Sequence, residues 1–255
     1  MSQHIPQHRT AIVTGAGSRR GIGRAICTEL ASMGYHVVAA DLDLPGCQEV
    51  AEECSRLGPE AMAVRCDVTS PDNVEAMVLA TLERFGRIDV LVNNAGITQR
   101  AVVTEIELAD WERILKVNLT GAFLCTRAVL PYMKAQGYGR IVSISSVSAK
   151  QGGGVYGGAH YCAAKAGILG FTKAVAREMG PYGITANAVC PGLVATDIRG
   201  GLEPQEVQQQ LTRHLPIPRM AQPFEVAAAV AFLASDRAAY ITGEALDING
   251  GLYFD

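Results

Sequence analysis

Short apolar runs alternate along the chain with longer segments whose apolar residues recur with a helical period. The runs that predict strands are Ala11–Thr14, His36–Ala40, Ala61–Cys66, Ile88–Val92, Arg140–Ile144, Ile184–Val189 and Ala245–Ile248. Several are apolar on both sides of the strand, as is typical of a parallel sheet covered by helices on both faces. The pattern predicts a doubly wound α/β fold, whose ligands bind outside the carboxyl ends of the strands.

One long segment interrupts this alternation. Residues 192–222 are rich in glycine and proline and contain one short polar helix pattern, around Glu203–Arg213. We expect a single domain over residues 1–255, with 192–222 as a substrate lid, because a segment this long between ordered elements is typical of a lid. A surface excursion without function is the alternative. Its basic residues, which suit a polar or anionic substrate or else form a solvated face, include Arg199, Arg213, His214 and Arg219.

The charge pattern bears on the kind of partner that the protein binds, and the cysteine content bears on the compartment in which it works. The 22 basic and 25 acidic residues include no Lys/Arg run, so we expect neither nucleic acid nor a membrane as a partner. Met1–Thr10 lacks the apolar stretch of a signal peptide, and the longest apolar run, Val226–Ala234, is too short to span a bilayer. Seven cysteines without a CxxC pair favour buried thiols and a cytoplasmic location. No HExxH motif or Cys/His cluster suggests a metal site.

A glycine-rich turn, Thr14–Gly23, directly follows the first predicted strand and precedes a helical segment from Arg24 to Met33. Glycines let the backbone approach a pyrophosphate, whose charge is stabilised by free amides and by the positive end of the helix. The spacing is not GxGxxG, so the prediction of a dinucleotide site depends on the order of strand, turn and helix.

The end of the second strand bears on the choice of dinucleotide. A carboxylate there, Asp41, accepts hydrogen bonds from ribose hydroxyls and repels a 2′-phosphate, which favours NAD over NADP. Arg19 and Arg20 favour the opposite choice, since a guanidinium near the ribose pairs with that phosphate. We give more weight to Asp41, and NADP remains the less favoured alternative.

Tyr161 and Lys165 lie four residues apart in a segment with a helical pattern that extends to about Met179, so their side chains share a helix face. Lowering a tyrosine pKa from 10 to about 7 requires roughly 4 kcal/mol. One positive charge at about 4 Å supplies about that much in an effective dielectric near 20. The pair therefore predicts a general acid/base. Alone, the alternative is a tyrosine packed at a helix start beside a solvated lysine.

Other polar residues strengthen this prediction because of where they follow the strands. Ser145 and Ser146 come directly after the fifth strand, where a hydroxyl can hydrogen-bond a substrate oxygen. Asn93–Gly96 follow the fourth strand, and a simple turn is the alternative there. Asn118 lies inside a helical stretch, where an ordinary interhelical hydrogen bond is the alternative.

With these motifs in place, the whole chain resembles the short-chain dehydrogenase/reductase family in its one-domain form, with a seven-stranded Rossmann sheet. The resemblance implies a catalytic set of Asn118, Ser146, Tyr161 and Lys165. It also implies cofactor contacts from Gly15, Ser18, Arg20, Gly21, Ile22, Gly23, Asp41, Asp67, Val68, Asn94, Ala95, Gly96, Tyr161, Lys165, Pro191, Gly192, Val194 and Thr196. Ile241–Gly243 through Gly250-Gly251 resembles the family's C-terminal strand region.

The resemblance also implies a role for each catalytic residue. Tyr161 exchanges the proton with the substrate oxygen, and Ser146 holds that oxygen. Lys165 lowers the tyrosine pKa and holds the nicotinamide ribose, while Asn118 supports a water-linked proton relay to Lys165. The protein then supplies position and charge stabilisation for a hydride transfer.

Two stretches depart from the family pattern. Five residues separate Gly15 from Gly21, so the turn is longer than in the common form, and Arg19 or Arg20 is free to lean away from the cofactor. The stretch from Ser146 to Tyr161 is also longer and glycine-rich, which makes Ser148 a rival for the substrate-holding hydroxyl. These departures leave the shape of the substrate pocket open.

The leading hypothesis is an NAD-linked oxidoreductase of a small secondary alcohol or ketone, such as a sugar, polyol or hydroxy acid. An NADPH-dependent 3-oxoacyl-(acyl-carrier-protein) reductase is the alternative, against which Asp41 speaks. A non-catalytic dinucleotide-binding sensor is the alternative of another class. The resemblance further implies a homotetramer built through the helices containing Asp110–Leu130 and Tyr161–Met179 and the C-terminal strand region.

Overall fold

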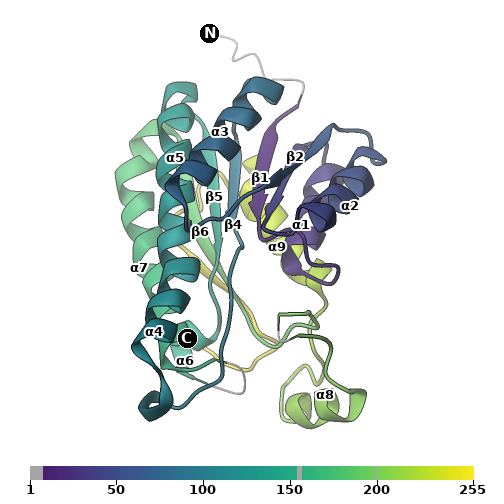
Figure 1. The fold of residues 1–255 in the computed structure, drawn as a ribbon, viewed down its shortest axis with the longest axis vertical. Helices are drawn as coiled ribbons and strands as arrows, with labels where there is room; N and C mark the ends of the chain where they lie inside the picture. Colours follow the sequence, from purple (N-terminus) through teal and green to yellow (C-terminus); the bar gives the residue numbers. More distant parts are fainter. Residues whose placement is uncertain (1–7, 154–156, 199) are drawn as a thin grey trace.

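The computed structural model describes residues 8–153, 157–198 and 200–255, and its centre is one sheet of seven parallel strands in the order β3-β2-β1-β4-β5-β6-β7 (Figure 1). The strands are β1 (Thr10–Thr14), β2 (His36–Asp41), β3 (Ala61–Arg65), β4 (Val90–Asn93), β5 (Gly139–Ile144), β6 (Ile184–Pro191) and β7 (Ala245–Ile248). The doubly wound α/β prediction is therefore confirmed, and each predicted strand appears with its ends shifted by two residues at most.

Helices cover both faces of the sheet. One face carries α1 (Ile22–Ser32), α2 (Leu44–Ser55) and α9 (Pro223–Ala234), and the other carries α3 (Pro71–Phe85), α5 (Gly121–Gln136) and α7 (Ala159–Met179) (Figure 1). Shorter helices are α4 (Leu108–Leu115), α6 (Ser148–Gln151) and α8 (Gln205–Thr212). The remaining turns are the 3₁₀ turns η1 (Val103–Glu105), η3 (Gly180–Tyr182) and η4 (Asp236–Ala238) and the π-helical turn η2 (Lys116–Thr120).

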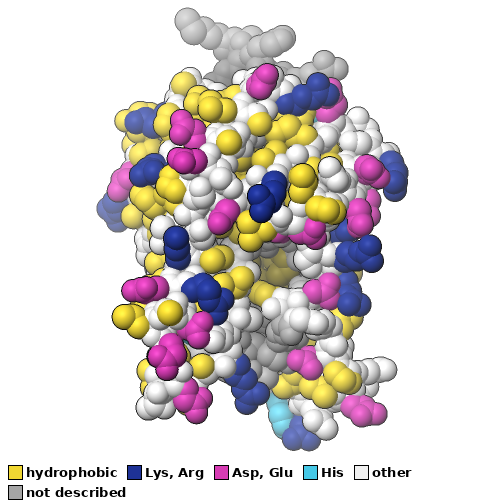
Figure 2. Space-filling view, viewed as in Figure 1, with side chains coloured by type: hydrophobic (Ala, Val, Ile, Leu, Met, Phe, Trp, Pro, Cys, Tyr) yellow, Lys and Arg dark blue, Asp and Glu magenta, His cyan; other side chains and the backbone are white. Residues whose placement is uncertain are grey.

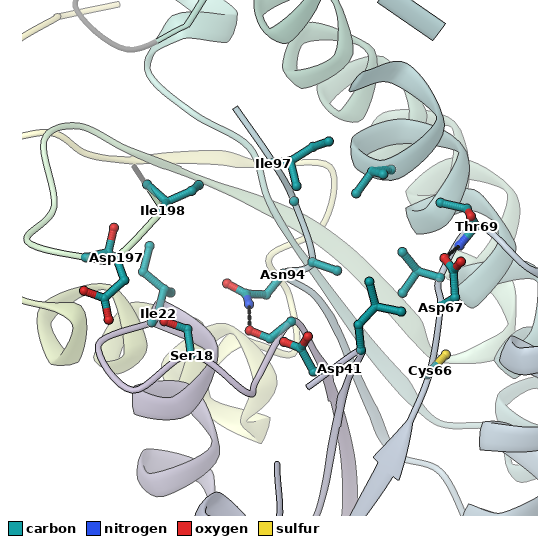
Figure 3. A pocket seen from close by; sticks show the side chains of 18 residues that line it. Ser18, Ile22, Asp41, Cys66, Asp67, Thr69, Asn94, Ile97, Asp197 and Ile198 are labelled. Atoms are coloured by element: carbon teal, nitrogen blue, oxygen red, sulfur yellow. Dashed lines mark hydrogen bonds between the residues drawn. The ribbon is translucent and has the colours of Figure 1, made fainter. Parts of the chain in front are cut away.

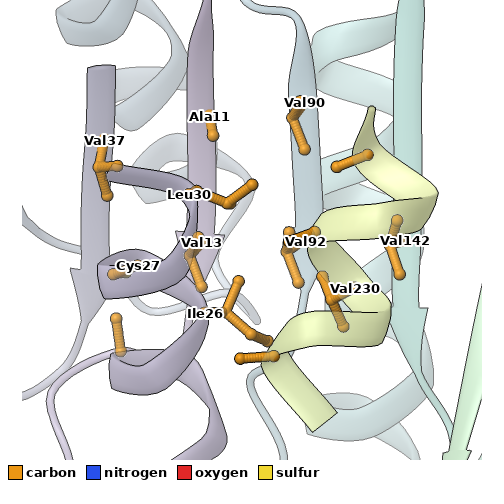
Figure 4. Packing of buried hydrophobic residues seen from close by; sticks show 14 of the residues in the cluster. Ala11, Val13, Ile26, Cys27, Leu30, Val37, Val90, Val92, Val142 and Val230 are labelled. Carbon is orange, nitrogen blue, oxygen red and sulfur yellow. The ribbon is translucent and has the colours of Figure 1, made fainter. Parts of the chain in front are cut away.

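Alternate residues of each strand enter two separate apolar cores, as the two-sided strand pattern predicts. In β1, Ala11 and Val13 pack with α1 and α9, whereas Ile12 between them packs with α3 and α5. Figure 4 shows the first core, where Val13 and Ile26 lie in contact range of the α9 side chains. Burying each aliphatic side chain of this size contributes about 1.5–3 kcal/mol, so the two cores hold the sheet edge that carries the site rigid.

The strand order places a crevice between β1 and β4. From β1 the chain proceeds outward through β2 and β3, and then returns to add β4 to β7 on the other side. At such a reversal the loops after neighbouring strands separate, which leaves room for a ligand at the carboxyl edge of the sheet. The loops that follow Thr14 and Asn93 border this crevice, where the sequence analysis expects the site.

The segment 192–222 forms an excursion beyond the sheet edge. Its two ends are joined, because the Ala221 amide donates to the Leu193 carbonyl and the Ala195 amide donates to the Ala221 carbonyl, each at 2.9 Å. Between them lies α8, in agreement with the predicted short helix. Arg199, one of the basic residues expected in this segment, lies outside the described residues.

On the face drawn in Figure 2, basic and acidic side chains are interspersed.

The sequence predicts no segment long enough to span a membrane, and the structure differs from this prediction in one helical stretch. In the described part of the chain, the continuous helical stretch Leu108–Gln136 is long and apolar enough to cross a membrane by length and composition alone. The prediction that no segment is long enough considered uninterrupted apolar runs and missed this helix. A core helix of a soluble protein passes the same test, and α5 in this stretch packs against β4 and β5.

All seven cysteines are free thiols, six of them buried and Cys162 partly exposed. Among the residues that the structure describes, no group of three or more His, Cys, Asp or Glu side chains is arranged to hold a metal ion.

Candidate active site

The glycine turn packs directly onto the end of β4. Gly15 has a φ of +67°, and a Cβ there would lie 2.7 Å from the Cα of Ala95. A Cβ on Gly23 would lie 2.4 Å from the Gly15 carbonyl oxygen. Asn94 ties the two loops together, since its Nδ2 donates to the carbonyls of Thr14 at 2.8 Å and Gly15 at 2.9 Å (Figure 3). Only glycine fits at these two positions, so the turn stays tight against the end of β4.

A cavity of about 300 Å³ opens beside this turn at the ends of β1 to β4 (Figure 3). Eleven of the predicted cofactor residues line it, namely Gly15, Ser18, Gly21, Ile22, Asp41, Asp67, Val68, Asn94, Ala95, Gly96 and Thr196. The structure thus brings together residues from five separate loops that the sequence analysis assigned to one site.

The Asp41 carboxylate is held at the edge of this cavity. Its Oδ2 accepts a hydrogen bond from the Gly17 amide at 2.9 Å, and its Oδ1 accepts one from the Asp43 amide at 3.2 Å. A Cβ on Gly17 would approach Asp43 to within 2.9 Å, so the lengthened turn folds over the end of β2. The carboxylate is therefore oriented by backbone amides on two sides.

Neither arginine of the turn lines this cavity. Arg19 pairs with Glu49 of α2 at 3.3 Å, and Arg20 Nε lies 2.8 Å from Asp197 Oδ1. Both guanidiniums are thus turned to carboxylates, and neither lines the cavity. Arg20, which the resemblance places among the cofactor contacts, directs its guanidinium to Asp197, and it is Asp197 that lines the cavity.

A second cavity, of about 220 Å³, adjoins the first and shares Ile22, Asn94, Gly96, Thr196 and Ile198 with it. Predicted residues that line it are Ser146, Ser148, Tyr161, Lys165, Pro191, Gly192 and Val194. The two cavities form one continuous crevice, with the glycine turn at one end and the Tyr161 side chain at the other.

The tyrosine and lysine lie as predicted on one face of α7, but their interaction differs from the prediction. Lys165 Nζ lies 5.7 Å from the centre of the Tyr161 ring and donates a hydrogen bond of 2.8 Å to the Ile144 carbonyl. Burial raises the pKa of Tyr161 to about 12, partly offset by a hydrogen bond with Ser146. Burial also lowers the pKa of Lys165 to about 8. In this geometry the pKa of Tyr161 is raised rather than lowered, and the largest cause is desolvation of the phenol by burial.

Asn118 lies in the π-helical turn η2 rather than in the regular helix that the sequence pattern indicates. Its Nδ2 donates to the carbonyls of Ile97 and Ile114, both at 2.9 Å. Its Oδ1 is buried and has no hydrogen-bond partner among the described residues. A Cβ on Gly96 would lie 2.7 Å from this oxygen and 3.4 Å from Lys165 Nζ, so Gly96 keeps open the space that both polar atoms border. An orphaned acceptor in such a space marks a binding position for a water or ligand group.

Ser146 and Ser148 both line the second cavity, but they differ in their contacts. Ser146 Oγ accepts a hydrogen bond from the Ser148 amide at 3.1 Å and is also hydrogen-bonded to the Tyr161 phenol. Ser145, by contrast, turns its hydroxyl away and donates to the Lys165 carbonyl at 2.8 Å. The pairing with Tyr161 singles out Ser146 as the hydroxyl beside the phenol.

Three of the predicted residues do not line either cavity: Arg20, Gly23 and Asn118. Lining residues absent from the prediction include Asp197, Ile198, Leu211 and Leu252. Asp197 and Ile198 directly follow Thr196, so their proximity was a signal available in the sequence. Leu211 and Leu252 come from α8 and from the segment after β7, and nothing in the sequence indicates that these meet.

Comparisons with known proteins identify similar chains over nearly the full length. A family model described as "Enoyl-(Acyl carrier protein) reductase" matches residues 15–253. A 3-oxoacyl-(acyl-carrier-protein) reductase from Synechocystis is 44% identical over 247 residues, covering 96% of each chain. An uncharacterized short-chain type dehydrogenase/reductase from Sinorhizobium fredii is 42% identical over 245 residues, covering 96% of this chain and 97% of that protein. A crystal structure of a short-chain type dehydrogenase/reductase from Mycobacterium marinum matches with a TM-score of 0.90 at 34% identity, covering 97% of this chain and 96% of that one.

Proposed function

The chain belongs to the short-chain dehydrogenase/reductase family of oxidoreductases, and we propose that it reduces 3-oxoacyl thioesters to 3-hydroxyacyl thioesters with NADH. The single observation that carries the substrate class is the apolar wall of the second cavity. Leu193, Leu211 and Leu252 line the space beside Ser146 and Tyr161. Such a wall suits an acyl chain better than the hydroxyls of a sugar or polyol.

The relatives support the same substrate class. Proteins named 3-oxoacyl-(acyl-carrier-protein) reductase, from Synechocystis and from Staphylococcus aureus, are 44% and 40% identical to this chain. This favours the reductase alternative over the sugar and polyol dehydrogenase that the sequence analysis placed first. Membership in an oxidoreductase family with Asn118, Ser146, Tyr161 and Lys165 all present disfavours a non-catalytic sensor.

The preference for NADH over NADPH rests on charge. Asp41 borders the first cavity, and Asp67 and Asp197 line it as well, whereas no lysine or arginine among the described residues does so. A 2′-phosphate beside Asp41 would meet a like charge without a cation to pair with. Arg19 and Arg20, the two residues able to supply one, are already paired with carboxylates.

The crevice fits a nicotinamide dinucleotide in shape and polarity. The tight Gly15–Gly23 turn and the N-terminus of α1 that follows it suit the pyrophosphate, and the space that Gly96 keeps open faces the buried Lys165 and the orphaned Asn118 oxygen. Gly96, Asn94 and Thr196 line both cavities and would hold the nicotinamide end. The bound dinucleotide supplies the hydride in this chemistry.

In the proposed reaction, Tyr161 donates the proton to the substrate oxygen. A phenol whose pKa is raised to about 12 is protonated at neutral pH, which is the form that reduction requires. Ser146, hydrogen-bonded to the phenol, holds the same oxygen. Lys165, whose pKa is lowered to about 8, returns a proton to the phenolate, and the Asn118 oxygen holds the water that links Lys165 to solvent.

The segment 192–222 acts as the lid over this crevice. Leu211 of α8 already lines the substrate cavity, and the joined ends of the segment allow α8 to move as a unit.

The protein works as a homotetramer. The helical stretch 108–136 exposes Leu108 at 70% and Phe123 at 40%, and a second copy of the chain would cover this apolar area.

Steady-state kinetics test the proposed function. Purified protein is assayed with NADH and with NADPH against acetoacetyl-CoA, and in the opposite direction with NAD against polyols and hydroxy acids, with Tyr161→Phe as the inactive control. We expect the thioester to give the highest kcat/KM with NADH. A higher kcat/KM for a polyol or hydroxy acid would replace the proposed substrate class with the small-alcohol alternative.

A further inference from the structure

The segment 249–255, after β7, folds back on itself beside the substrate cavity. The Gly251 amide donates to Asn249 Oδ1, and Asn249 Nδ2 donates to the Tyr253 carbonyl, both at 2.9 Å. Gly250 and Gly251 have φ values of +64° and +82°, a conformation that favours glycine and makes the tight reversal accessible. Asn249 is buried, so the side chain that makes both hydrogen bonds is fixed within the folded protein.

One side of the turn is held by the lid segment. The Ile217 amide donates to the Gly250 carbonyl at 3.1 Å. A Cβ on Gly251 would lie 2.5 Å from the Pro216 ring, so the Gly251 backbone packs directly on that ring. The turn and the end of the 192–222 segment are therefore packed together and restrain each other.

The other side is held by Lys150 of α6, close to the chain end in Figure 1. Its ammonium forms ion pairs with Asp255 and, at 2.7 Å, with Asp247 of β7, and donates to the Ala245 carbonyl at 3.2 Å. The Lys150 side chain is only 8% exposed and its partner Asp247 is 25% exposed, so this pair is screened less than a surface pair, whereas the Asp255 carboxylate is 61% exposed. The pKa of Lys150 is raised by the two carboxylates, which keeps the ammonium charged.

These anchors place Leu252 in the wall of the substrate cavity, together with Leu211 of α8. Lys150 belongs to the same short helix as Ser148, whose amide holds Ser146 Oγ. The reacting end of the cavity and its apolar wall are thus joined through α6. Neither Lys150 nor Asp255 lines the cavity itself among the described residues.

We propose that Lys150 pins the 249–255 segment through Asp255, so that Leu252 sets the length of acyl group that the cavity accepts. This inference rests on the proposed 3-oxoacyl substrate. Leu252 is the specificity-determining side chain, and Lys150 is a positioning residue that acts through the segment. Each methylene that gains or loses burial changes kcat/KM by about fourfold, so chain length is a sensitive readout.

The first test compares chain-length profiles. NADH-dependent reduction of acetoacetyl-CoA and 3-oxooctanoyl-CoA is measured for the wild type, Leu252→Ala and Leu252→Phe, with Phe254→Ala as the matched control because Phe254 is exposed and does not line the cavity. We expect Leu252→Ala to raise the long-to-short ratio of kcat/KM about tenfold and Leu252→Phe to lower it about tenfold. Phe254→Ala should leave the ratio unchanged. An unchanged ratio in both Leu252 variants overturns the inference.

The second test needs no substrate. Hydrogen exchange of the 249–255 amides is measured in the wild type, Lys150→Met, Lys150→Arg and Asp255→Asn, the last removing only the exposed partner of the pair. We expect exchange about tenfold faster in Lys150→Met, which loses both ion pairs, about threefold faster in Asp255→Asn, which loses only the exposed pair, and close to the wild-type rate in Lys150→Arg. Wild-type exchange rates in Asp255→Asn and Lys150→Met together would overturn the role of Lys150. If the exchange effect appears but the wild type reduces no thioester, the proposed function fails and the acyl-length role of Leu252 fails with it.

Discussion

The Gly17 amide donates a hydrogen bond of 2.9 Å to the Asp41 carboxylate, which fastens the lengthened glycine turn to the end of β2. The bond fixes where the negative charge stands at the edge of the first cavity. Because a carboxylate and a 2′-phosphate repel each other, we expect the position of this one charge to favour NADH over NADPH.

Replacing Asp41 by asparagine removes the negative charge and keeps one of the two hydrogen-bond acceptors, and it therefore tests the cofactor preference. We expect Asp41→Asn to raise the ratio of kcat/KM for NADPH to that for NADH by about tenfold to a hundredfold, since one like charge is lost. Asp72→Asn, which neutralises an exposed carboxylate on α3 away from the crevice, is the control. A ratio that stays at the wild-type value in both variants contradicts the assignment of Asp41.

The ion pair between Arg20 and Asp197 joins the glycine turn to the segment after β6, and Asp197 lines the first cavity. In Arg20→Ala the Asp197 carboxylate loses its partner and faces an incoming pyrophosphate as a like charge. We expect the Kd for NADH, measured by fluorescence titration, to rise about threefold to fivefold, with little change in Tm because exposed ion pairs contribute at most about 1 kcal/mol. Arg19→Ala should bind NADH as the wild type does, since Arg19 pairs with Glu49 on the outer side. Equal weakening in both variants argues against a specific role for the Arg20 pair.

The two serines of the second cavity are separable by kinetics. Ser146 is hydrogen-bonded to the Tyr161 phenol, so we expect Ser146→Ala to lower kcat for acetoacetyl-CoA reduction by about 10²–10³. Ser148 contributes its amide to Ser146 Oγ, and Ser148→Ala preserves that amide, so its kcat should fall less than about fivefold. The reverse order of the two effects would make Ser148 the substrate-holding residue.

Periodicity along the chain predicts the fold well because strand and helix patterns are local. The seven strands and the helix carrying Tyr161 and Lys165 follow from such patterns, and the motif residues then collect at one sheet edge because parallel strands align their carboxyl ends. The pKa values of Tyr161 and Lys165 could not be predicted from such patterns, because they depend on how deeply each side chain is buried. Lys165 was expected to act on the phenol, yet its ammonium bonds the Ile144 carbonyl, an acceptor distant in sequence.

Contacts between distant segments were equally hidden. Asn118 lies in a π-helical turn, which holds one more residue than a regular helical turn. The spacing of apolar residues does not reveal such a turn, so the sequence pattern could not predict it. Leu252 lines the cavity from a segment that contacts Lys150 of α6 and Ile217 of the 192–222 segment. Neither contact has a local sequence signal, and for this reason the substrate wall was the part of the site that the sequence left open.

Burial of Lys165 makes a further prediction about stability. Lowering its pKa from 10.5 to about 8 corresponds to about 3 kcal/mol of burial cost for the ammonium, offset in part by the hydrogen bond to Ile144. Below pH 8 the lysine is charged in both the folded and the unfolded chain, so the wild type carries the full cost. Between pH 8 and 10.5 the folded state sheds the proton while the unfolded state keeps it, and the cost disappears as the pH rises.

We therefore expect Lys165→Met to raise the free energy of unfolding by about 2 kcal/mol at pH 7, and by much less at pH 9.5, while it lowers kcat at least about a hundredfold. Urea unfolding at the two pH values measures the first effect. Lys173→Met, which removes an exposed lysine from the same helix, should show no such pH dependence. A stability gain of equal size at pH 7 and 9.5 would mean that packing, and not the buried charge, distinguishes Lys165→Met from the wild type. A loss of stability at pH 7 would mean that the bond to Ile144 outweighs the burial of the ammonium.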